Sequence, residues 1–374
     1  MANTNEPLYM QIYKQLREDI LAMKYPAGKR LPTEKELCKI YHVSRITAKN
    51  ALNMLAEDKL IVRIKGKGSF VSHNQALHTI DNKQGNAQKT IGVIIPEFED
   101  IYGRDMLAAI EKHCRKHGFL CMICRSEESQ QVEAQALDNM IQHGVAGIII
   151  MPVFGVYYNA KILQLVLDAF PVVLVDRDLR GIPVHFVGTD NITAAETAMD
   201  YLIQAGHKKI GVYASYSKNT SSVEDRIEGI HRSLHKNNLL LEPSLFYMMP
   251  FKSALPNYGT PEIFGKDREA AIKHMKENQG MTAAIAMGYK VALVVRSAAE
   301  KLGLKVPEDI QIVCFDGPKQ TPLGEYHFTH MRQNQEDMGR KAVELILSLL
   351  NGNIQENTVK INLSASLICA KCTQ

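Results

Sequence analysis

Basic side chains gather near the start of the chain, at a density that suits binding to a polyanion. Residues 1–72 carry 13 Lys and Arg against 7 Asp and Glu, a balance of +6, whereas the remaining 302 residues carry 31 against 33. Cationic side chains displace the counterions around nucleic-acid phosphates, which supplies much of the affinity for nucleic acid. The charge distribution therefore predicts a nucleic-acid-binding segment in the first seventy residues.

Two closely spaced helix starts would position these cations. Thr33 and Glu36 have the spacing of a capping box, so a helix is expected to begin at residue 32 or 33 and to run to about Tyr41. Ser44 is a good N-cap for a second helix, whose buried face has four apolar residues at helical intervals, Ala48, Ala51, Leu52 and Leu55. The exposed start of that helix carries three polar residues, Arg45, Thr47 and Lys49. This spacing predicts a helix-turn-helix, whose second helix enters the major groove of DNA.

A short hairpin is expected directly after these helices. Residues 60–64 alternate toward a glycine-containing turn and residues 69–71 return from it, with Lys65, Gly66 and Lys67 at the tip. A basic tip suits phosphates or a minor groove. A capping box or a basic hairpin alone usually marks only an ordinary helix or a solvated turn, but together with the local charge they favour a DNA-binding head.

Residues 7–71 also resemble the GntR-type winged helix-turn-helix. The resemblance rests on Pro7-Leu8-Tyr9, on the Gly-x-x-Leu-Pro-x-Glu pattern from Gly28 to Glu34, and on Gly68-Ser-Phe-Val71. It implies base and phosphate contacts from Lys35, Ser44, Arg45, Thr47 and Lys49, and wing contacts from Lys65 and Gly66. The basic residues Arg30 and Lys67 complete the set of candidate DNA contacts. Ile46 departs from the polar residue often found there, and its side chain could touch a thymine methyl group instead.

Composition limits the classes of protein to which the chain can belong. With 374 residues and 45% hydrophobic content, it is long enough for two or three domains with a sizeable core. We expect a cytoplasmic protein with no membrane association, because no apolar run approaches ~20 residues and the N-terminus lacks a secretion signal. The seven cysteines are expected to be reduced; the pairs Cys121/Cys124 and Cys369/Cys372 have CxxC spacing, but we expect neither metal nor cofactor.

A second, larger unit is expected after a polar connector at residues 73–89. From residue 90, apolar runs typical of buried strands alternate with amphipathic helical stretches, and the pattern repeats after about residue 209. The fold class is therefore α/β: a small head followed by two doubly wound parallel-sheet subdomains, whose ligands bind at the carboxyl ends of the strands.

Residues 90–370 resemble the LacI/GalR effector domain, which is itself similar to periplasmic sugar-binding proteins. The markers include Gly144-Val-Ala-Gly147, Val172 to Arg177, Arg226-Ile-Glu-Gly229 and Gly303 to Asp309. A GntR-type head on such a body is the layout of the AraR-like, arabinose-responsive repressors. The resemblance implies a homodimer on a pseudo-palindromic operator, a wing-bearing head at 1–72, and a body at 90–374. Its N-subdomain would span about 90–189 and 317–348, and its C-subdomain about 190–316 and 349–374.

The cleft of such a body would bind a small sugar through polar side chains and an aromatic ring. No Trp exists, so Tyr102 or Phe154 must supply a ring, unless they are ordinary core or surface aromatics. Arg177, at the end of a buried strand, could hold two hydroxyls or a carboxylate, or could pair with Asp178 near a helix start. The family positions near the effector match Asn191 and Arg226, while Asp190 could simply cap the following helix.

Four further candidates lie near the crossover and after a later strand. Asp316 is expected at a crossover, as a hinge residue or a ligand contact, with Gln333 beside it. Where the family usually has an acidic or Asn-Asp pair, this chain has Gly288-Tyr289-Lys290. If Lys290 faces the cleft, the effector could be anionic, or Tyr289 could stack on a sugar; otherwise Lys290 points to solvent.

These observations favour a sequence-specific DNA-binding transcriptional regulator, expected to be a repressor of carbohydrate-utilisation genes. A sugar-responsive activator and a sugar-binding protein without a DNA role are the alternatives. An enzyme is not expected, because the common phosphate-loop, nucleophile-elbow and zinc-protease motifs are absent from the sequence. Arabinose, another pentose, a deoxyhexose or an acidic sugar all stay open as the effector.

Overall fold

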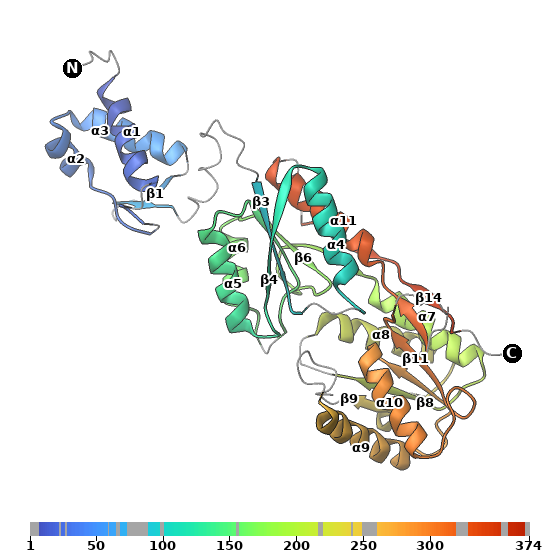
Figure 1. Cartoon of the computed structure of the whole chain (residues 1–374). Coiled ribbons are helices and arrows are strands. Elements are labelled where there is room, and N and C mark those ends of the chain that lie inside the picture. Colours follow the sequence, from blue (N-terminus) through green and yellow to red (C-terminus); the bar gives the residue numbers. More distant parts are fainter. Residues whose placement is uncertain are drawn as a thin grey trace.

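The computed structural model contains a small N-terminal head and a larger two-lobed body (Figure 1). It describes residues 7–21, 24–26, 28–58, 60–64, 68–72, 89–97, 101–154, 157–215, 220–240, 242–248, 260–318, 328–352 and 358–370. None of the helices within these ranges is long and apolar enough to cross a lipid bilayer.

The head has three helices and a two-stranded hairpin. Its elements are α1 (Leu8–Leu21), α2 (Glu34–Tyr41), α3 (Arg45–Glu57), β1 (Ile61–Ile64) and β2 (Gly68–Val71). The capping box is confirmed, since the Thr33 side chain accepts from the Glu36 N–H and the Thr33 N–H donates to Glu36 Oε2 at 2.7 Å. Ser44 caps α3 by accepting from the Thr47 N–H at 3.2 Å. The predicted helix-turn-helix and hairpin are therefore both present, with their apolar faces joined in one core.

The first lobe is a six-stranded parallel sheet in the order β13-β7-β6-β5-β3-β4. Its strands are β3 (Lys89–Ile95), β4 (Phe119–Arg125), β5 (Gly147–Ile150), β6 (Val172–Val175), β7 (His185–Thr189) and β13 (Lys360–Leu363). One face is covered by α4 (Arg104–Lys116) and α11 (Gln335–Leu350), and the other by α5 (Gln130–Gln142) and α6 (Ala160–Leu167), as Figure 1 shows. Because helices cover both faces, the central strands are wholly apolar.

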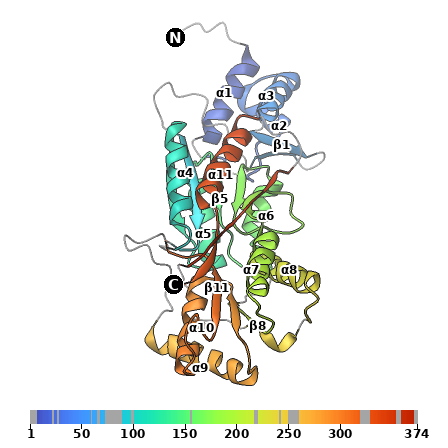
Figure 2. The ribbon, with the colours of Figure 1, turned by 90° about the vertical axis from the view of Figure 1, so that its right-hand side faces the viewer.

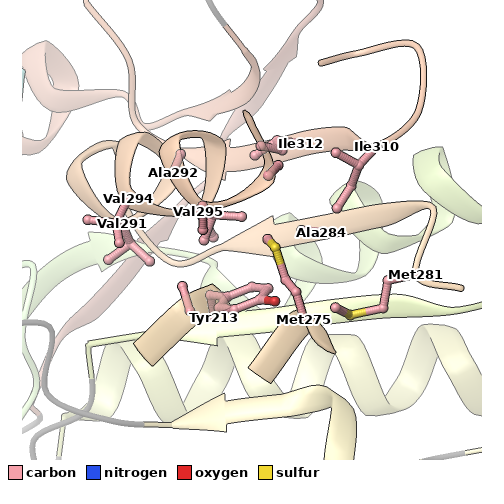
Figure 3. Close-up of a cluster of buried hydrophobic side chains, with 14 of the residues drawn as sticks. Tyr213, Met275, Met281, Ala284, Val291, Ala292, Val294, Val295, Ile310 and Ile312 are labelled. Carbon is pink, nitrogen blue, oxygen red and sulfur yellow. The ribbon is translucent and has the colours of Figure 1, made fainter. Parts of the chain in front are cut away.

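The second lobe repeats this plan in the order β14-β12-β11-β10-β8-β9. Its strands are β8 (Ile210–Ala214), β9 (Phe246–Met248), β10 (Ala283–Ala286), β11 (Gln311–Phe315), β12 (Thr329–Arg332) and the antiparallel β14 (Ser366–Ile368). Its helices are α7 (Asn191–Gln204), α8 (Ser221–Lys236), α9 (Pro261–Glu277) and α10 (Tyr289–Lys301), with a short 3-10 turn at Pro243–Leu245. Figure 3 shows the core under α10, where Val291, Val294 and Val295 lie over the sheet.

The chain passes between the lobes three times, at positions that differ from the predicted subdomain limits. Figure 2 shows the red C-terminal segment running from one lobe to the other. The prediction assigned 317–348 to the first lobe, but β12 pairs in parallel with β11 of the second. It assigned 349–374 to the second lobe, but β13 pairs with β7 of the first. Both strands are only four residues long, so a local apolar pattern could not reveal which sheet they complete.

Two glycines allow helices to pack at unusually short distances. A Cβ on Gly229 of α8 would lie 2.1 Å from the Ile192 carbonyl oxygen of α7, and one on Gly339 of α11 would lie 2.5 Å from the Met106 carbonyl oxygen of α4. No other residue fits such contacts without moving backbone. Gly229 of the Arg226-to-Gly229 pattern therefore seats α8 on α7, and Arg226 on the same helix is buried and bonds to Asn191 of α7.

Candidate functional site

The surface formed by α2, α3 and the base of the hairpin encloses a depression of about 620 Å³. Arg30, Lys35 and Arg45 line it, and three of the predicted DNA contacts therefore converge. The Arg45 side chain is 84% exposed, and Ile46 beside it is 73% exposed. Such exposed groups at the start of a recognition helix are available to base edges.

The other predicted DNA contacts differ in their availability. Lys49 is exposed on α3, whereas Ser44 and Thr47 bond to each other, with 2.8 Å between their hydroxyl oxygens. Arg30 lies against Gly68 at the base of the hairpin, where a Cβ on Gly68 would be 2.8 Å from Arg30 Nε. The predicted contacts Lys65, Gly66 and Lys67 fall outside the described residues.

Sequence reasoning missed a carboxylate that organises this surface. Glu34 accepts hydrogen bonds from Arg45 Nε at 3.0 Å and from Arg63 Nη2 at 2.6 Å. The hydrogen bond from Arg45, with further contributions from Arg63, lowers the pKa of Glu34 below its ordinary value. Glu34 therefore stays ionised and holds two guanidinium groups over the depression. The sequence did contain a signal for Glu34, because this residue ends the Gly-x-x-Leu-Pro-x-Glu pattern.

In the body, a cavity of about 180 Å³ lies between the lobes at the carboxyl ends of the strands. Nine residues line it: Ile101, Tyr102, Ser215, Met287, Gly288, Tyr289, Lys290, Val291 and Asp316. Four of the predicted effector contacts are among them, from loops of both lobes. The placement agrees with the rule that open parallel sheets bind ligands at this edge.

Two carboxylates with unusual backbone geometry lie between the lobes: Asp316 lines the 180 Å³ cavity, and Asp176 lines a neighbouring cavity of about 110 Å³. Asp176 follows β6 with φ 64°, and Asp316 follows β11 of the other lobe with φ 62°. Non-glycine residues seldom adopt this left-handed region, and where they do the strain often marks a functional site. Asp176 accepts from the Tyr102 hydroxyl at 2.5 Å, and Asp316 accepts from Gln333 Nε2 at 3.0 and 3.1 Å.

Arg226 is a buried cation between these carboxylates. Its Nε donates to Asn191 Oδ1 at 2.8 Å, its Nη1 donates to the Met287 carbonyl at 3.1 Å, and its guanidinium lies 3.8 Å from the Phe315 ring centre. Burial lowers the pKa of Arg226, and the charges of Asp316 and Asp176 oppose that change. Burial and the same two carboxylates raise the pKa of Tyr102 well above its ordinary value, so its hydroxyl keeps its proton.

Gln333 joins the cleft to the first crossover. Its amide nitrogen donates to Asp316, and its Oε1 accepts from the Thr189 hydroxyl at 2.6 Å. Asp190, one residue on, caps α7 by accepting from the Thr193 N–H at 3.1 Å, which confirms its capping alternative. Hydrogen bonds through Gln333 thus connect Asp316 to Thr189, where the chain first passes between the lobes.

Arg177 and Phe154 form a stacked pair that does not line the 180 Å³ cavity. The guanidinium lies 3.9 Å from the Phe154 ring centre, and its fork binds Glu128 at 2.8 and 3.1 Å. A further bond goes to the Pro152 carbonyl. The pairing of Arg177 with Asp178 is not what the structure has, since Asp178 pairs with Lys360 at 2.6 Å. Glu128 was missed, because it lies 49 residues from its partner.

Glu133, a second missed carboxylate, supports the loop that carries Phe154. Its side chain is buried on α5 and accepts from the Val153 N–H at 2.6 Å and from Asn159 Nδ2 at 2.8 Å. Burial raises the pKa of Glu133 to about 7, although both hydrogen bonds act in the opposite direction. The loop beside the cleft is therefore fixed by a group that titrates near neutral pH.

The cysteine pairs do not gather into a ligand set within the described ranges. Cys121 packs in the core on the α4 side of the first sheet, and Cys124 packs on the opposite side, as predicted for residues three apart on a strand. No group of three or more His, Cys, Asp or Glu in this part of the chain could hold a metal ion. Cys372 of the second pair falls outside it.

The fold and the two surfaces define a class of protein: a DNA-binding regulator whose N-terminal winged head is joined to a two-lobed ligand-binding body. The chain belongs to the family of periplasmic binding protein domains, matched over residues 91–354, and it carries a domain of the gntR family of bacterial regulatory proteins over residues 8–71. Both resemblances drawn from the sequence are thereby confirmed.

Known proteins of similar sequence and fold are regulators. The chain is 24% identical over 349 residues to an arabinose metabolism transcriptional repressor of Geobacillus stearothermophilus, covering 92% of this chain and 91% of the relative. It is 24% identical to the HTH-type transcriptional repressor PurR of Pasteurella multocida, covering 91% and 98%. Among solved structures, the transcription regulator CcpA of Lactococcus lactis has a TM-score of 0.63 at 21% identity, covering 77% of this chain and all of that one. A LacI family regulator from Enterococcus faecium with bound ribose has a TM-score of 0.62 at 19% identity, covering 75% and 97%.

Proposed function

We propose that the protein is a cytoplasmic transcriptional repressor whose hold on operator DNA is controlled by a small sugar or sugar derivative bound between the lobes. The observation that carries the proposal is the cavity between the lobes, which Asp316 and the buried Tyr102 line and on which the nearby charges of Asp176 and Arg226 act. The proposal contains no enzymatic step.

The chemistry of the cleft favours a polyhydroxylated ligand. Carboxylates accept hydrogen bonds from adjacent hydroxyls, and a buried guanidinium donates to ring or hydroxyl oxygens, so a sugar can satisfy both. Tyr102 and Tyr289 offer rings for its C–H face. The relative named for arabinose metabolism and the structure with bound ribose support a pentose as the first choice.

Lys290 supports a second candidate effector, an acidic sugar. It lines the cavity at the start of α10, whose first residue follows Gly288, and no side chain caps that helix. A cation and a helix N-terminus both favour a carboxylate or phosphate. The neutral sugar stays the main proposal, because Asp176 and Asp316 would repel an anion across the same cleft.

On the DNA side, we propose that Arg45, Lys49 and Ile46 meet base edges while Arg30, Lys35 and the hairpin meet phosphates. Residues 1–72 would form the head, 73–89 a connector, and 90–374 a body that also forms the homodimer. Two heads related by a two-fold axis would then bind a pseudo-palindromic operator. The repressor names of the relatives favour repression over activation.

The effector would control the heads by changing the arrangement of the two lobes relative to each other. A hydrogen bond already joins the two lobes, from Asp178 N–H to the Ser221 hydroxyl at 3.0 Å, and the crossover residue Gln333 accepts from Thr189 of the first lobe. A sugar that binds one arrangement of the lobes better than another shifts the population toward it. Such a shift would alter the spacing of two heads tethered to the dimeric body.

The test is a fluorescence anisotropy titration of the full chain on the DNA upstream of its own gene, with and without each of a panel of monosaccharides. We expect tight binding that one sugar weakens. Asp316→Asn should keep DNA binding and lose the sugar response, whereas Arg45→Ala should lose DNA affinity and keep the sugar-induced rise in melting temperature. If no sugar changes either DNA binding or melting temperature, the effector half of the proposal fails.

A further inference from the structure

Two thiols that do not line the cleft lie against each other near one edge of the first lobe. Cys114 is in the last turn of α4 and is fully buried, while Cys121 is on β4 and is half-buried. Both pack into the core between the first sheet and the helices α4 and α11. We propose that this pair is a redox-modification site, at which a peroxide converts the two thiols into an intramolecular disulfide.

The chain reverses sharply between the two cysteines. α4 ends at Lys116, Gly118 has φ 80°, and β4 begins at Phe119. Glycine adopts this left-handed conformation without steric cost, so the turn is short. It places the end of the helix over the third residue of the strand, and the two thiols hydrogen-bond to each other. A disulfide therefore requires only that two neighbouring sulfur atoms move closer.

The surroundings of the two sulfur atoms assign them different roles. The hydrogen bond from Cys114 lowers the pKa of Cys121, although burial and the charge of Glu111 act in the opposite direction. The same hydrogen bond, together with burial, raises the pKa of Cys114. Cys121 therefore ionises first, and a thiolate is the form that attacks a peroxide. Cys114 keeps its proton and is the resolving thiol.

A small oxidant can reach Cys121 from the flank of the sheet. β4 is the last strand of its sheet, where it pairs with β3 on one side, and its residues Leu120 and Ile123 are exposed. Cys314 of the second lobe differs in each respect. It is fully buried, its thiol donates to the Asp316 carbonyl at 3.3 Å, and burial raises its pKa well above the ordinary value. We expect Cys314 to stay reduced.

The oxidation takes place in two steps. The Cys121 thiolate attacks one peroxide oxygen, the O–O bond breaks, and a sulfenic acid forms as the other oxygen leaves and takes up a proton as water. The Cys114 sulfur then attacks the sulfenic sulfur, the S–O bond breaks, and the Cys114 proton leaves with that oxygen as a second water. Two thiols are thus oxidised by two electrons, and one hydrogen peroxide is reduced to two waters.

The experiment treats the full chain with hydrogen peroxide, blocks the remaining thiols with N-ethylmaleimide, and analyses a tryptic digest by mass spectrometry. Trypsin cleaves after Arg115 and Lys116, so Cys114 and Cys121 fall on separate peptides. Cys124 shares the second peptide with Cys121, because no Lys or Arg lies between them. We expect peroxide to join the two peptides and dithiothreitol to separate them again.

Three variants identify the sulfur atoms that form the link. Cys124→Ser is the matched control, because Cys124 lies on the same strand but packs on the opposite face of the sheet, and it should keep the joined peptides. Cys121→Ser should lose them and leave the buried Cys114 reduced. Cys114→Ala keeps a small apolar side chain in the core; it should lose the link and let Cys121 proceed to the sulfinic acid.

The exposed Cys369 shows whether the dose of oxidant was sufficient. The inference is overturned if the two wild-type peptides stay separate at a peroxide dose that oxidises Cys369. This outcome is measured on wild type, so it does not depend on the folding of a variant. The inference is equally overturned if Cys124→Ser abolishes the link, because Cys124 would then be the partner of Cys114.

Discussion

Glu133 gives the sharpest quantitative prediction, because its carboxylate is buried and titrates near neutral pH. The ordinary pKa of a glutamate is 4.5, and burial raises that of Glu133 to about 7. Because the pKa of Glu133 is higher in the folded state than in the unfolded state, the folded state is favoured when this carboxyl group is protonated. The stabilising effect is complete below pH 4.5 and is lost as the pH rises through 7.

The magnitude follows from the interval between the two pKa values. At about 1.4 kcal/mol per pH unit, the interval from 4.5 to about 7 corresponds to about 3 kcal/mol. The glutamine of Glu133→Gln stays neutral at every pH. The unfolding free energy of this variant should therefore not fall between pH 4.5 and about 7 for this reason. Because glutamine can accept from only one of the two donors, Val153 N–H or Asn159, the variant should also be less stable than wild type at pH 4.5 by about 1–2 kcal/mol.

The assay is urea unfolding of the full chain, followed by circular dichroism at pH values from 4.5 to 8. The unfolding free energy of wild type should fall relative to Glu133→Gln by about 3 kcal/mol across this range. Glu111→Gln, an exposed glutamate paired with Arg115 on α4, is the matched control and should follow the wild-type curve. Parallel curves for wild type and Glu133→Gln would refute the reasoning.

Four further outcomes are expected. Arg45→Ala should weaken operator binding by about 1–3 kcal/mol in an anisotropy titration, and undiminished binding would remove it from the contacts. Glu34→Gln releases two arginines, so binding to scrambled DNA should strengthen while the preference for operator falls; an unchanged preference would contradict this. Asp316→Asn should cost about 1.5–3 kcal/mol of sugar affinity by calorimetry, and wild-type affinity would exclude it as a ligand contact. Lys290→Ala should weaken a uronic acid more than its neutral sugar, and equal effects would reject an anionic effector.

The head could be predicted in detail because its signals are local. The capping box joins Thr33 to Glu36, three residues apart, and Ser44 caps the helix that begins one residue later. Helical periodicity then identified which residues of α3 are buried. Such features depend only on neighbours in sequence, so the helix-turn-helix followed without any knowledge of the fold.

The cleft was only partly predictable, because its partners are distant in the sequence. The carboxyl ends of strands indicated Tyr102 and Asp316, which both line the 180 Å³ cavity, and the family resemblance indicated Arg226, on which the charge of Asp316 acts. No local pattern could show that Arg177 pairs with Glu128, or that Arg63 shares Glu34 with Arg45 across 29 residues. These pairs exist only after the sheets have brought their loops together.

The lobe boundaries failed for a related reason. β12 and β13 have four residues each, and β13 alternates exposed with half-buried positions because it lies at the edge of its sheet. The sheet that such a strand joins is decided by its pairing, with β11 for β12 and with β7 for β13. Four residues of sequence do not show which strand that partner will be. Periodicity identified the buried strands and left the crossing points undetermined.

The most direct test of the account is binding of the purified chain to the DNA upstream of its own gene, measured by anisotropy at low and at physiological salt. We predict saturable binding that exceeds binding to scrambled DNA, that weakens as salt rises, and that one monosaccharide reverses. Equal affinity for both duplexes, or no binding in dilute buffer, would contradict it.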